Sequence, residues 1–365
     1  MGSQNSHCRT TPQNAWPKQC FRTSMFTSNL LGRGVGIALF VLTLVAPTTA
    51  KTVLKIGTLA PDGSSWITAL RAIDDEIRSA TQDQVRLKIY PGGVQGDEDV
   101  MLRKIRIGQL HGAGLAGTGI SHVLPDMLAL QMPFLFDNYA EVDYVLAQME
   151  SYYQQAFLEA GFTVLGWSDI GFVYLMTQQP VASVADIRGH KVWRLQDEPI
   201  TGVLFKEAGV TSIPLAIPDV LLGLQTNLID VVYASPAAAI VLQWFTRVKY
   251  YTNVPINYSL GAFVIQQKAF EQITATQQQQ LLEISRRHIR THNQKGRADN
   301  EDALQIMQRE GIAAVDSSPD AIASFQQLVR DVTPHLVGEA FSAQVYEQIL
   351  RHLADFRAKA ESETP

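Results

Sequence analysis

Asp186-Ile-Arg-Gly-His-Lys-Val-Trp-Arg-Leu-Gln-Asp-Glu-Pro199 opens the stretch from Asp186 to Phe245, and this stretch decides the fold. After its strand-like opening the pattern alternates: a helix at 200–208, a strand at 210–215, a helix that Pro218 opens, a strand at 229–233, and a helix that Pro236 opens and that carries Gln243 and Trp244. Proline suits a first helical turn because its φ is fixed and it has no N–H to leave unpaired. Strands that alternate with helices in this way predict a parallel sheet.

Ligands of parallel sheets bind near the carboxyl ends of the strands. Four residues end strands in this stretch and are the first candidates for a binding site: Trp193, Arg194, Tyr233 and Ser235. Tyr233 joins an apolar ring to a polar hydroxyl, a combination that suits a ligand pocket. Arg194 could equally be a solvated charge at the end of its strand.

Three motifs in this stretch follow one another in a specific order. They are Gly189-His-Lys-Val-Trp193, Pro218-Asp-Val220 with Leu224-Gln-Thr226, and Leu228-Ile-Asp230. Together with Pro133-Phe-Leu-Phe136 and an opening strand at 54–60, they resemble the DctP-type solute-binding subunits of tripartite ATP-independent periplasmic (TRAP) transporters. The likeness covers nearly all of the chain after residue 51. The resemblance implies a two-lobed α/β fold in which each lobe is an open sheet flanked by helices. It also implies that the protein binds a small organic ligand and delivers it to membrane transporter subunits.

Length and composition describe an ordinary globular protein. At 365 residues the chain is too long for one compact core and suits two domains. Apolar residues make up 46% and charged residues 18%, which is usual for globular proteins. The formal net charge of −5 argues against a nucleic-acid partner.

Residues 1–50 are predicted to be a secretory signal peptide. The apolar run 34–45 is too short to span a bilayer, and Arg33 precedes it. We expect cleavage after Ala50. An uncleaved membrane anchor is the alternative interpretation of the same run, and both Met1 and Met25 are open as translation starts.

Removing this leader changes the totals for the mature chain. Cys8 and Cys20 both lie in the leader, so the mature chain has no cysteine, neither for disulfides nor for lipid attachment. The leader also holds four basic and no acidic residues, which leaves 26 basic against 35 acidic residues and a net charge of −9. We therefore expect a soluble protein in the periplasm of a Gram-negative bacterium.

Hydrophobic periodicity predicts the remaining elements. The expected strands are 52–59, 85–90, 112–119, 162–167, 171–177 and 258–265, and the expected helices are 66–80, 97–107, 140–160, 276–310, 321–332 and 341–359. The resemblance implies that the strands at 171–177 and 258–265 cross between two lobes as a hinge, and that the long helix 276–310 braces both. The predicted first lobe is 51–170 with 259–300, and the predicted second lobe is 171–258 with 301–365.

Motifs for catalysis, cofactors or metals are not found. Gly112, Gly114 and Gly117 satisfy the spacing of a dinucleotide-binding fingerprint, but a helix precedes them where a strand is needed. We read this segment as a strand whose small residues let a ligand or the other lobe approach closely. His288 and His292 are four residues apart on the long helix, and they are interpreted as lying on a solvated face. We predict no catalytic residue, no metal site and no cofactor.

The predicted ligand-binding residues are Trp66, Phe134, Tyr174, Trp193, Arg194, Tyr233 and Ser235. For Trp66 a pocket role and a core role are both open, and Tyr174 faces either the cleft or the core of a lobe. Trp244 is expected in a core.

One departure from the family pattern bears on the ligand. Most members resembling this chain carry an arginine at the fourth position past the glycine of the Gly-x-Lys motif, where it pairs with a ligand carboxylate. Here that position is Trp193, and the arginine is Arg194. Successive side chains of a strand point to opposite sides, so only one of the two faces the cleft. We expect Trp193 to face it, unless a bulge returns Arg194 to the clamp position.

The departure predicts a ligand with a large apolar body, such as a lipid-like, sterol-like or aromatic molecule. The alternative is a small carboxylate bound by Arg194. A two-lobed periplasmic enzyme and an extracytoplasmic sensor domain are further alternatives, and the absence of a nucleophile and base at recognisable spacing favours binding over both.

Overall fold

The computed structural model describes residues 51–363, so the predicted signal peptide lies outside the described residues. These residues form a ten-stranded sheet flanked by helices. Its strands are β1 (Thr52–Thr58), β2 (Val85–Tyr90), β3 (Gly112–Ala116), β4 (Phe162–Thr177), β5 (Lys191–Arg194), β6 (Thr211–Pro214), β7 (Val231–Ala234), β8 (Tyr250–Thr252), β9 (Asn257–Gln266) and β10 (Ala313–Val315).

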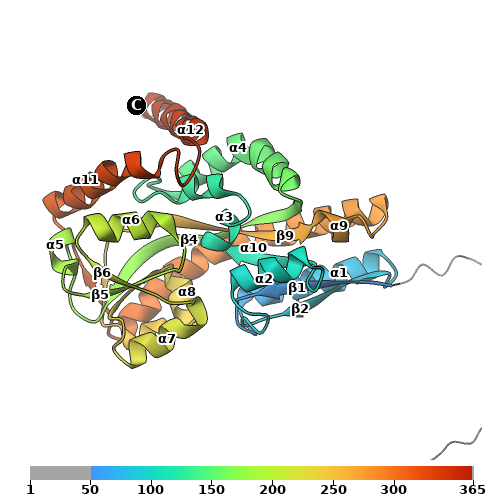
Figure 1. Cartoon of the computed structure of the whole chain (residues 1–365), viewed down its shortest axis with the longest axis horizontal. Coiled ribbons are helices and arrows are strands. Elements are labelled where there is room, and N and C mark those ends of the chain that lie inside the picture. Colours follow the sequence, from blue (N-terminus) through green and yellow to red (C-terminus); the bar gives the residue numbers. More distant parts are fainter. Residues whose placement is uncertain (1–50, 364–365) are drawn as a thin grey trace, which may run out of the picture. The chain divides into compact units, whose positions relative to one another are not determined.

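The strand order divides the sheet into two half-sheets joined by β4. The order is β2-β1-β3-β9-β4-β7-β5-β6, with β8 pairing with β4 and β10. In the first half-sheet β2, β1 and β3 run parallel, and β9 is antiparallel to both β3 and β4. In the second half-sheet β7, β5 and β6 run parallel, as the alternation of strands and helices predicted. Figure 1 shows β4 running from one group of elements to the other.

The helices cover both half-sheets. Those along the first half of the chain are α1 (Ser65–Ala80), α2 (Glu98–Arg106), α3 (Thr118–Ser121), the 3-10 helix η1 (Pro125–Gln131) and α4 (Tyr139–Glu159). Those of the second half are α5 (Val184–Ile187), α6 (Pro199–Glu207), α7 (Ile217–Gln225), α8 (Pro236–Val241), the 3-10 helix η2 (Trp244–Arg247), α9 (Gln267–Phe270), α10 (Ala275–Arg309), α11 (Pro319–Leu336) and α12 (Ala343–Glu363). None of these helices is long and apolar enough to cross a membrane.

The element β4 differs from the sequence prediction, which placed two strands at 162–167 and 171–177. It is one strand of 16 residues, and its pairing with β9 shifts register twice, between Val164 and Gly166 and between Asp169 and Gly171. Gly171 has a φ of 108°, which a residue with a side chain rarely adopts. The two predicted strands are therefore one continuous strand, and β-bulges accommodate its register shifts.

The long helix α10 holds these bulges. Its Asn293 side chain donates to the Trp167 carbonyl over 2.9 Å and accepts from the Asp169 N–H over 3.0 Å. Two turns later Asn300 donates to the Ile170 carbonyl over 3.1 Å and accepts from the N–H of Ala237 in α8 over 3.0 Å. The helix also packs against α1. It therefore touches elements around both half-sheets, as the bracing role requires, while the boundaries of the two lobes stay a prediction.

One further prediction about the elements needs correction, and two short strands were missed. The helix that Pro236 opens ends at Val241, because Gln243 adopts a left-handed φ of 60°. Trp244 consequently begins the separate 3-10 helix η2. The short strands β8 and β10 were not predicted, and three residues give too little periodicity to reveal a strand.

The glycines of β3 allow close approach, but by a strand and a side chain where the sequence pattern predicted a ligand or the other lobe, and the strand ends at Ala116 instead of residue 119. A Cβ on Gly112 would lie 2.4 Å from the Val264 carbonyl oxygen of β9, and a Cβ on Gly114 would lie 2.7 Å from the Trp66 ring nitrogen. The neighbour that approaches this strand is therefore β9 together with the side chain of Trp66.

Candidate functional site

A cavity lies at the carboxyl ends of β5 and β7, where parallel-sheet geometry predicts a ligand site. It leaves about 210 Å³ open to the centres of water molecules, and one water needs only about 10–15 Å³ of such space. Residues of both half-sheets contribute to it. Its lining comprises Ala116, Gly117, Thr118, Leu128, Gln131, Pro133, Phe134, Ile170, Val173, Leu175, Val184, Ile187, Trp193, Leu195, Glu198, Ile200, Thr201, Leu204, Phe205, Ala208, Ile217, Tyr233, Ala234, Ser235, Ala238, Leu242, Trp244, Ile256, Asn257, Ser259, Phe325, Leu328 and Val329.

Four of the predicted site residues meet in this lining: Phe134, Trp193, Tyr233 and Ser235. The other three lie elsewhere, and their part in binding stays a prediction. Trp66 packs against Phe263 of β9 and His292 of α10. Tyr174 packs against Tyr251, with ring centroids 6.1 Å apart.

The structure places Trp193, and not Arg194, at the cavity. Residues 191–194 of β5 pair with 211–214 of β6 one to one, so no bulge interrupts the strand and Arg194 is not returned to the clamp position. The Arg194 guanidinium donates to the Leu195 carbonyl over 3.3 Å, and Arg194 is absent from the lining. The position that the family pattern gives to arginine is thus occupied by an indole.

Trp193 belongs to an aromatic wall that it forms with Tyr233 and Trp244. The ring centroids of Trp193 lie 4.8 Å from those of Tyr233 and 5.1 Å from those of Trp244. The indole N–H donates to the Leu215 carbonyl over 3.0 Å, which fixes the ring. Trp244, expected in a core, is buried and also lines the cavity. Burial is the main cause that raises the pKa of the Tyr233 hydroxyl, and the nearby Glu198 carboxyl adds to the rise.

Charge is nearly absent from the cavity. Among the residues described, no lysine, arginine or histidine lines it, and Glu198 is its one carboxyl group. Glu198 precedes α6 and caps it: the carboxyl accepts from the Ile200 N–H over 3.0 Å and from the Thr201 N–H over 2.7 Å, and also from the Thr201 hydroxyl. Burial raises the pKa of this carboxyl, and the hydrogen bonds it accepts oppose that rise.

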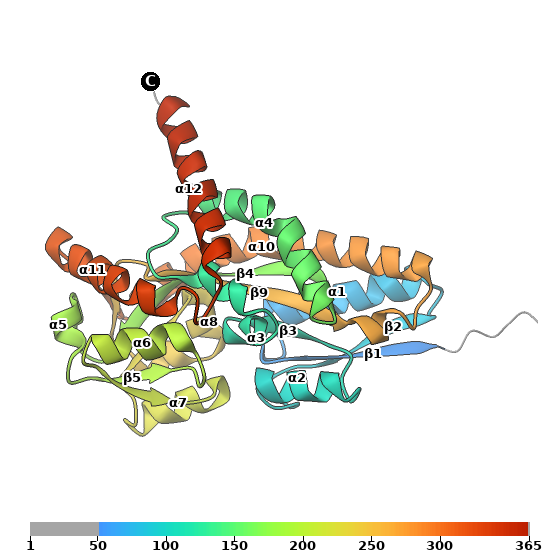
Figure 2. The same cartoon turned by 45° about the horizontal axis from the view of Figure 1, so that its top comes forward.

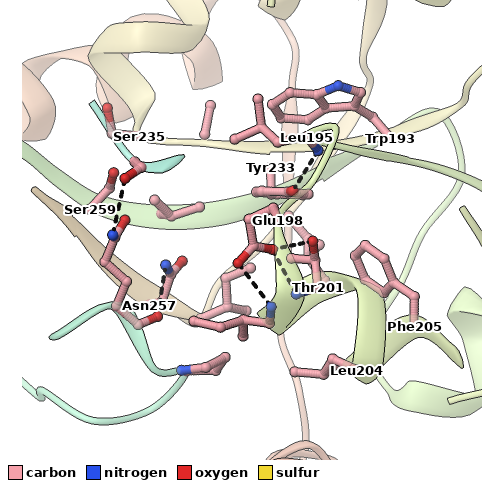
Figure 3. Close-up of a pocket in the computed structure, with 18 of the residues that line it drawn as sticks. Trp193, Leu195, Glu198, Thr201, Leu204, Phe205, Tyr233, Ser235, Asn257 and Ser259 are labelled. Carbon is pink, nitrogen blue, oxygen red and sulfur yellow. Dashed lines mark hydrogen bonds between the residues drawn. The ribbon is translucent and has the colours of Figure 1, made fainter. Parts of the chain in front are cut away.

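The remaining polar groups gather at one end of the cavity. Figure 3 shows Ser235, Ser259 and Asn257 on one side and Leu204 and Phe205 on the other, with Glu198 between them. The Asn257 amide donates to the Gln131 carbonyl over 3.3 Å, and the Gln131 amide donates to the Gly117 carbonyl over 3.3 Å. The cavity is therefore amphipathic, with a short polar end and a long apolar remainder.

The helix α11 covers the apolar end. It supplies Phe325, Leu328 and Val329 to the lining and packs against α6. Figure 2 shows α11 lying alongside α6. Sequence patterns predicted this helix but gave no sign that it reaches the cavity, because its partner α6 lies more than a hundred residues earlier. Glu198 and Asn257 were also missed, because their places in the cavity depend on contacts between segments far apart in the sequence: α6 with α11, and Asn257 with Gln131.

An acidic depression adjoins the cavity and shares Thr118, Leu195 and Ile217 with it. Its acidic residues are Asp97, Glu98, Asp99 and Asp197, and its basic residues are Arg103 and His122. Arg103 forms an ion pair with Asp99. Burial raises the pKa of Glu98 to about 8, since the backbone N–H of Ala116 and its other donors only partly offset desolvation. The surroundings of the cavity thus carry more negative than positive groups.

Comparisons with known proteins agree with this architecture. Residues 56–339 match the family model described as bacterial extracellular solute-binding protein, family 7. A solute-binding protein of Verminephrobacter eiseniae is 24% identical over 278 residues, which cover 74% of this chain and 82% of that protein. The 2,3-diketo-L-gulonate-binding periplasmic protein YiaO of Escherichia coli is 28% identical over 207 residues, covering 54% of this chain and 62% of that protein.

A solved structure extends the likeness to the whole fold. The TRAP periplasmic solute-binding protein of Xanthobacter autotrophicus, with bound β-D-galacturonate, matches with a TM-score of 0.77 at 19% identity, covering 82% of this chain and 99% of that one. The predicted two-lobed α/β fold class is thereby confirmed. The match over most of the chain also confirms the family that the sequence motifs indicated: this chain belongs to the bacterial extracellular solute-binding proteins of family 7, the DctP-type binding proteins of TRAP transporters.

Proposed function

We propose that this protein captures a ligand with a substantial apolar body and no carboxylate clamp, and delivers it to the membrane subunits of a TRAP transporter. The observation that carries the proposal is the cavity lining: an indole stands at the arginine position, and the described lining contains no cation. A buried carboxylate needs charge-assisted hydrogen bonds to offset its desolvation. An apolar body, in contrast, gains from every apolar wall it covers.

The relatives define the alternative. The Xanthobacter autotrophicus protein holds galacturonate, and a neighbour from Polaromonas holds D-erythronate, both of which are sugar acids. A small carboxylate in the present chain would require Arg194 to leave the Leu195 carbonyl and enter the cavity. The relatives are named as binding proteins, and we propose no catalytic step for this chain.

Ligand binding by matched variants tests the proposal. We expect the purified protein to release apolar molecules in native mass spectrometry, and to bind the neutral apolar dye N-phenyl-1-naphthylamine but not D-galacturonate. Leu328→Trp fills the end of the cavity beneath α11 and is expected to weaken dye binding at least about tenfold, since the indole takes the volume of the ligand. Leu350→Trp, at an exposed position on α12 outside the lining, is the control.

Two results would contradict this expectation. Tight binding of D-galacturonate that Arg194→Ala abolishes and Trp193→Ala spares would establish the carboxylate alternative. Equal dye binding by Leu328→Trp and Leu350→Trp would show that the dye sits outside the cavity.

Delivery requires that the protein reach the periplasm. TRAP solute-binding proteins are periplasmic, and we propose that residues 1–50 are the leader that directs export. Amino-terminal sequencing of the protein from the periplasmic fraction is expected to begin at Lys51. A mature terminus far from Lys51, or retention in the membrane fraction, would refute the leader.

A further inference from the structure

We propose that Glu198 determines the charge of the ligand: it accepts a hydrogen bond from a neutral or cationic group at the polar end of the ligand and excludes anionic groups from that end. This inference rests on the function proposed above and deepens it. It predicts the ligand class as an amphiphile that carries a hydroxyl, amide N–H or ammonium group and no acid.

The geometry of Glu198 leaves room for such a bond. A carboxyl group offers about four acceptor positions on its two oxygens. Three are occupied in the structure: Oε1 accepts from Ile200, and Oε2 accepts from both the N–H and the hydroxyl of Thr201. One acceptor position therefore remains, on Oε1, and Glu198 itself lines the cavity while being only 8% exposed.

The cation whose charge acts on Glu198 is Arg194, but Arg194 is absent from the lining and its guanidinium donates to the Leu195 carbonyl. In either protonation state Glu198 offers no positive charge, and when ionised it repels a second anion inside a poorly solvated site. The Glu198 carboxyl also occupies the amino-terminal end of α6, which would otherwise be the backbone feature best suited to an anion. The chain thus supplies its own carboxyl where a ligand carboxylate would be most stable.

The other polar side chains of the lining can meet an uncharged head group of either kind. Asn257 and Gln131 each use one amide N–H on a backbone carbonyl, so each retains a second N–H and its acceptor oxygen. Ser235 and Ser259 also line the cavity, and the Ser235 hydroxyl oxygen accepts from the Ala238 N–H over 3.4 Å. These side chains therefore do not select between donors and acceptors, and the selection against anions rests on the Glu198 carboxyl.

Three probes with one tail and different heads test the assignment: octan-1-ol, octylammonium and octanoate. Their binding is measured by the change in tryptophan fluorescence, because Trp193 and Trp244 line the cavity. We expect the full mature protein to bind octan-1-ol and octylammonium at least about tenfold more tightly than octanoate.

Two variants in the same helix separate the Glu198 carboxyl from a general effect of lost charge. Glu198→Gln keeps a capping oxygen and removes the charge, and it is expected to bring octanoate to within about threefold of octan-1-ol and to weaken octylammonium. Glu207→Gln makes the same substitution at the exposed last residue of α6, outside the lining, and it is expected to keep the preference of the wild type. Thermal melting verifies that both variants are folded, and if Glu198→Gln does not fold, the wild-type profile decides.

The outcomes distinguish the inference from the function on which it rests. Equal binding of all three probes by the wild type would overturn the role of Glu198 and leave an apolar ligand in place. An unchanged preference in Glu198→Gln would likewise overturn it. If none of the three probes binds while D-galacturonate does, the apolar ligand itself is refuted, and the inference falls with it.

Discussion

Arg297→Met is expected to lower the free energy of unfolding by about 3 kcal/mol, the lower end of the range for breaking one side of a buried ion pair. Arg297 of α10 donates from Nε to Asp169 over 2.6 Å and from a terminal nitrogen to Asp143 over 2.7 Å. The Asp169 side chain is only 6% exposed, while that of Arg297 is 26% exposed. Methionine leaves the carboxylate at the β4 bulge without its cation, although the Tyr258 hydroxyl still donates to it.

The matched control is Asp143→Asn, which removes the other partner of Arg297. The Asp143 side chain is 55% exposed, so this pair is expected to contribute no more than about 1 kcal/mol. Urea denaturation of the three proteins, compared at constant m-value, measures both changes. If Arg297→Met costs no more than Asp143→Asn, the ion pair at the bulge is not what holds α10 to β4.

Trp193→Ala is expected to lower the free energy of unfolding by about 3–5 kcal/mol and to abolish binding of the apolar dye. The side chain is 2% exposed, lies between the rings of Tyr233 and Trp244, and donates to the Leu215 carbonyl. Its removal therefore leaves a hole in the wall of the cavity and an unpaired carbonyl. Trp193→Phe keeps a ring but loses the N–H. Its free energy of unfolding and its dye affinity are expected to lie between those of the wild type and those of Trp193→Ala.

Arg194→Ala provides the control at the next residue of the same strand. Arg194 is partly buried, donates to the Leu195 carbonyl and is absent from the cavity lining, so its loss is expected to change stability by less than about 1 kcal/mol and dye binding by less than about twofold. Chemical denaturation and dye titration on the same preparations give both quantities. A larger loss of dye binding in Arg194→Ala than in Trp193→Ala would reverse the roles assigned to the two residues.

Local sequence signals predicted most of the fold because they act over a few residues. Pro218 and Pro236 each stand in the first turn of a helix, and β2 has the bounds that alternation indicated. Where contacts with distant residues determine the structure, the secondary structure predicted from local signals was wrong. Residues 168–170 belong to neither of the two predicted strands, yet Asn293, Arg297 and Asn300 of a distant helix satisfy their polar groups inside one strand.

The candidate site was predicted only where it lies at strand ends. Trp193, Tyr233 and Ser235 follow from the position of their strands, since ligands gather at carboxyl ends in parallel sheets. Glu198 looks in the sequence like one more solvent-exposed acid in a Gln-Asp-Glu run, and its burial follows only from the packing of α6 and α11. Gln243 gives no local sign of a left-handed φ, so the break before Trp244 could not be predicted.

The position of β9 has a consequence for how the protein is made. Among the described residues this strand alone links β3 to β4 in the sheet, yet residues 257–266 follow β3 by about 140 positions. Strand pairings between residues so distant in sequence form slowly, because the entropy cost of closing a long loop arises before any contact can offset it. A chain emerging from its amino terminus must therefore keep the edges of β3 and β4 unpaired until more than two thirds of it has appeared. Such edges attract other strands, and a holding chaperone during synthesis and export would protect them.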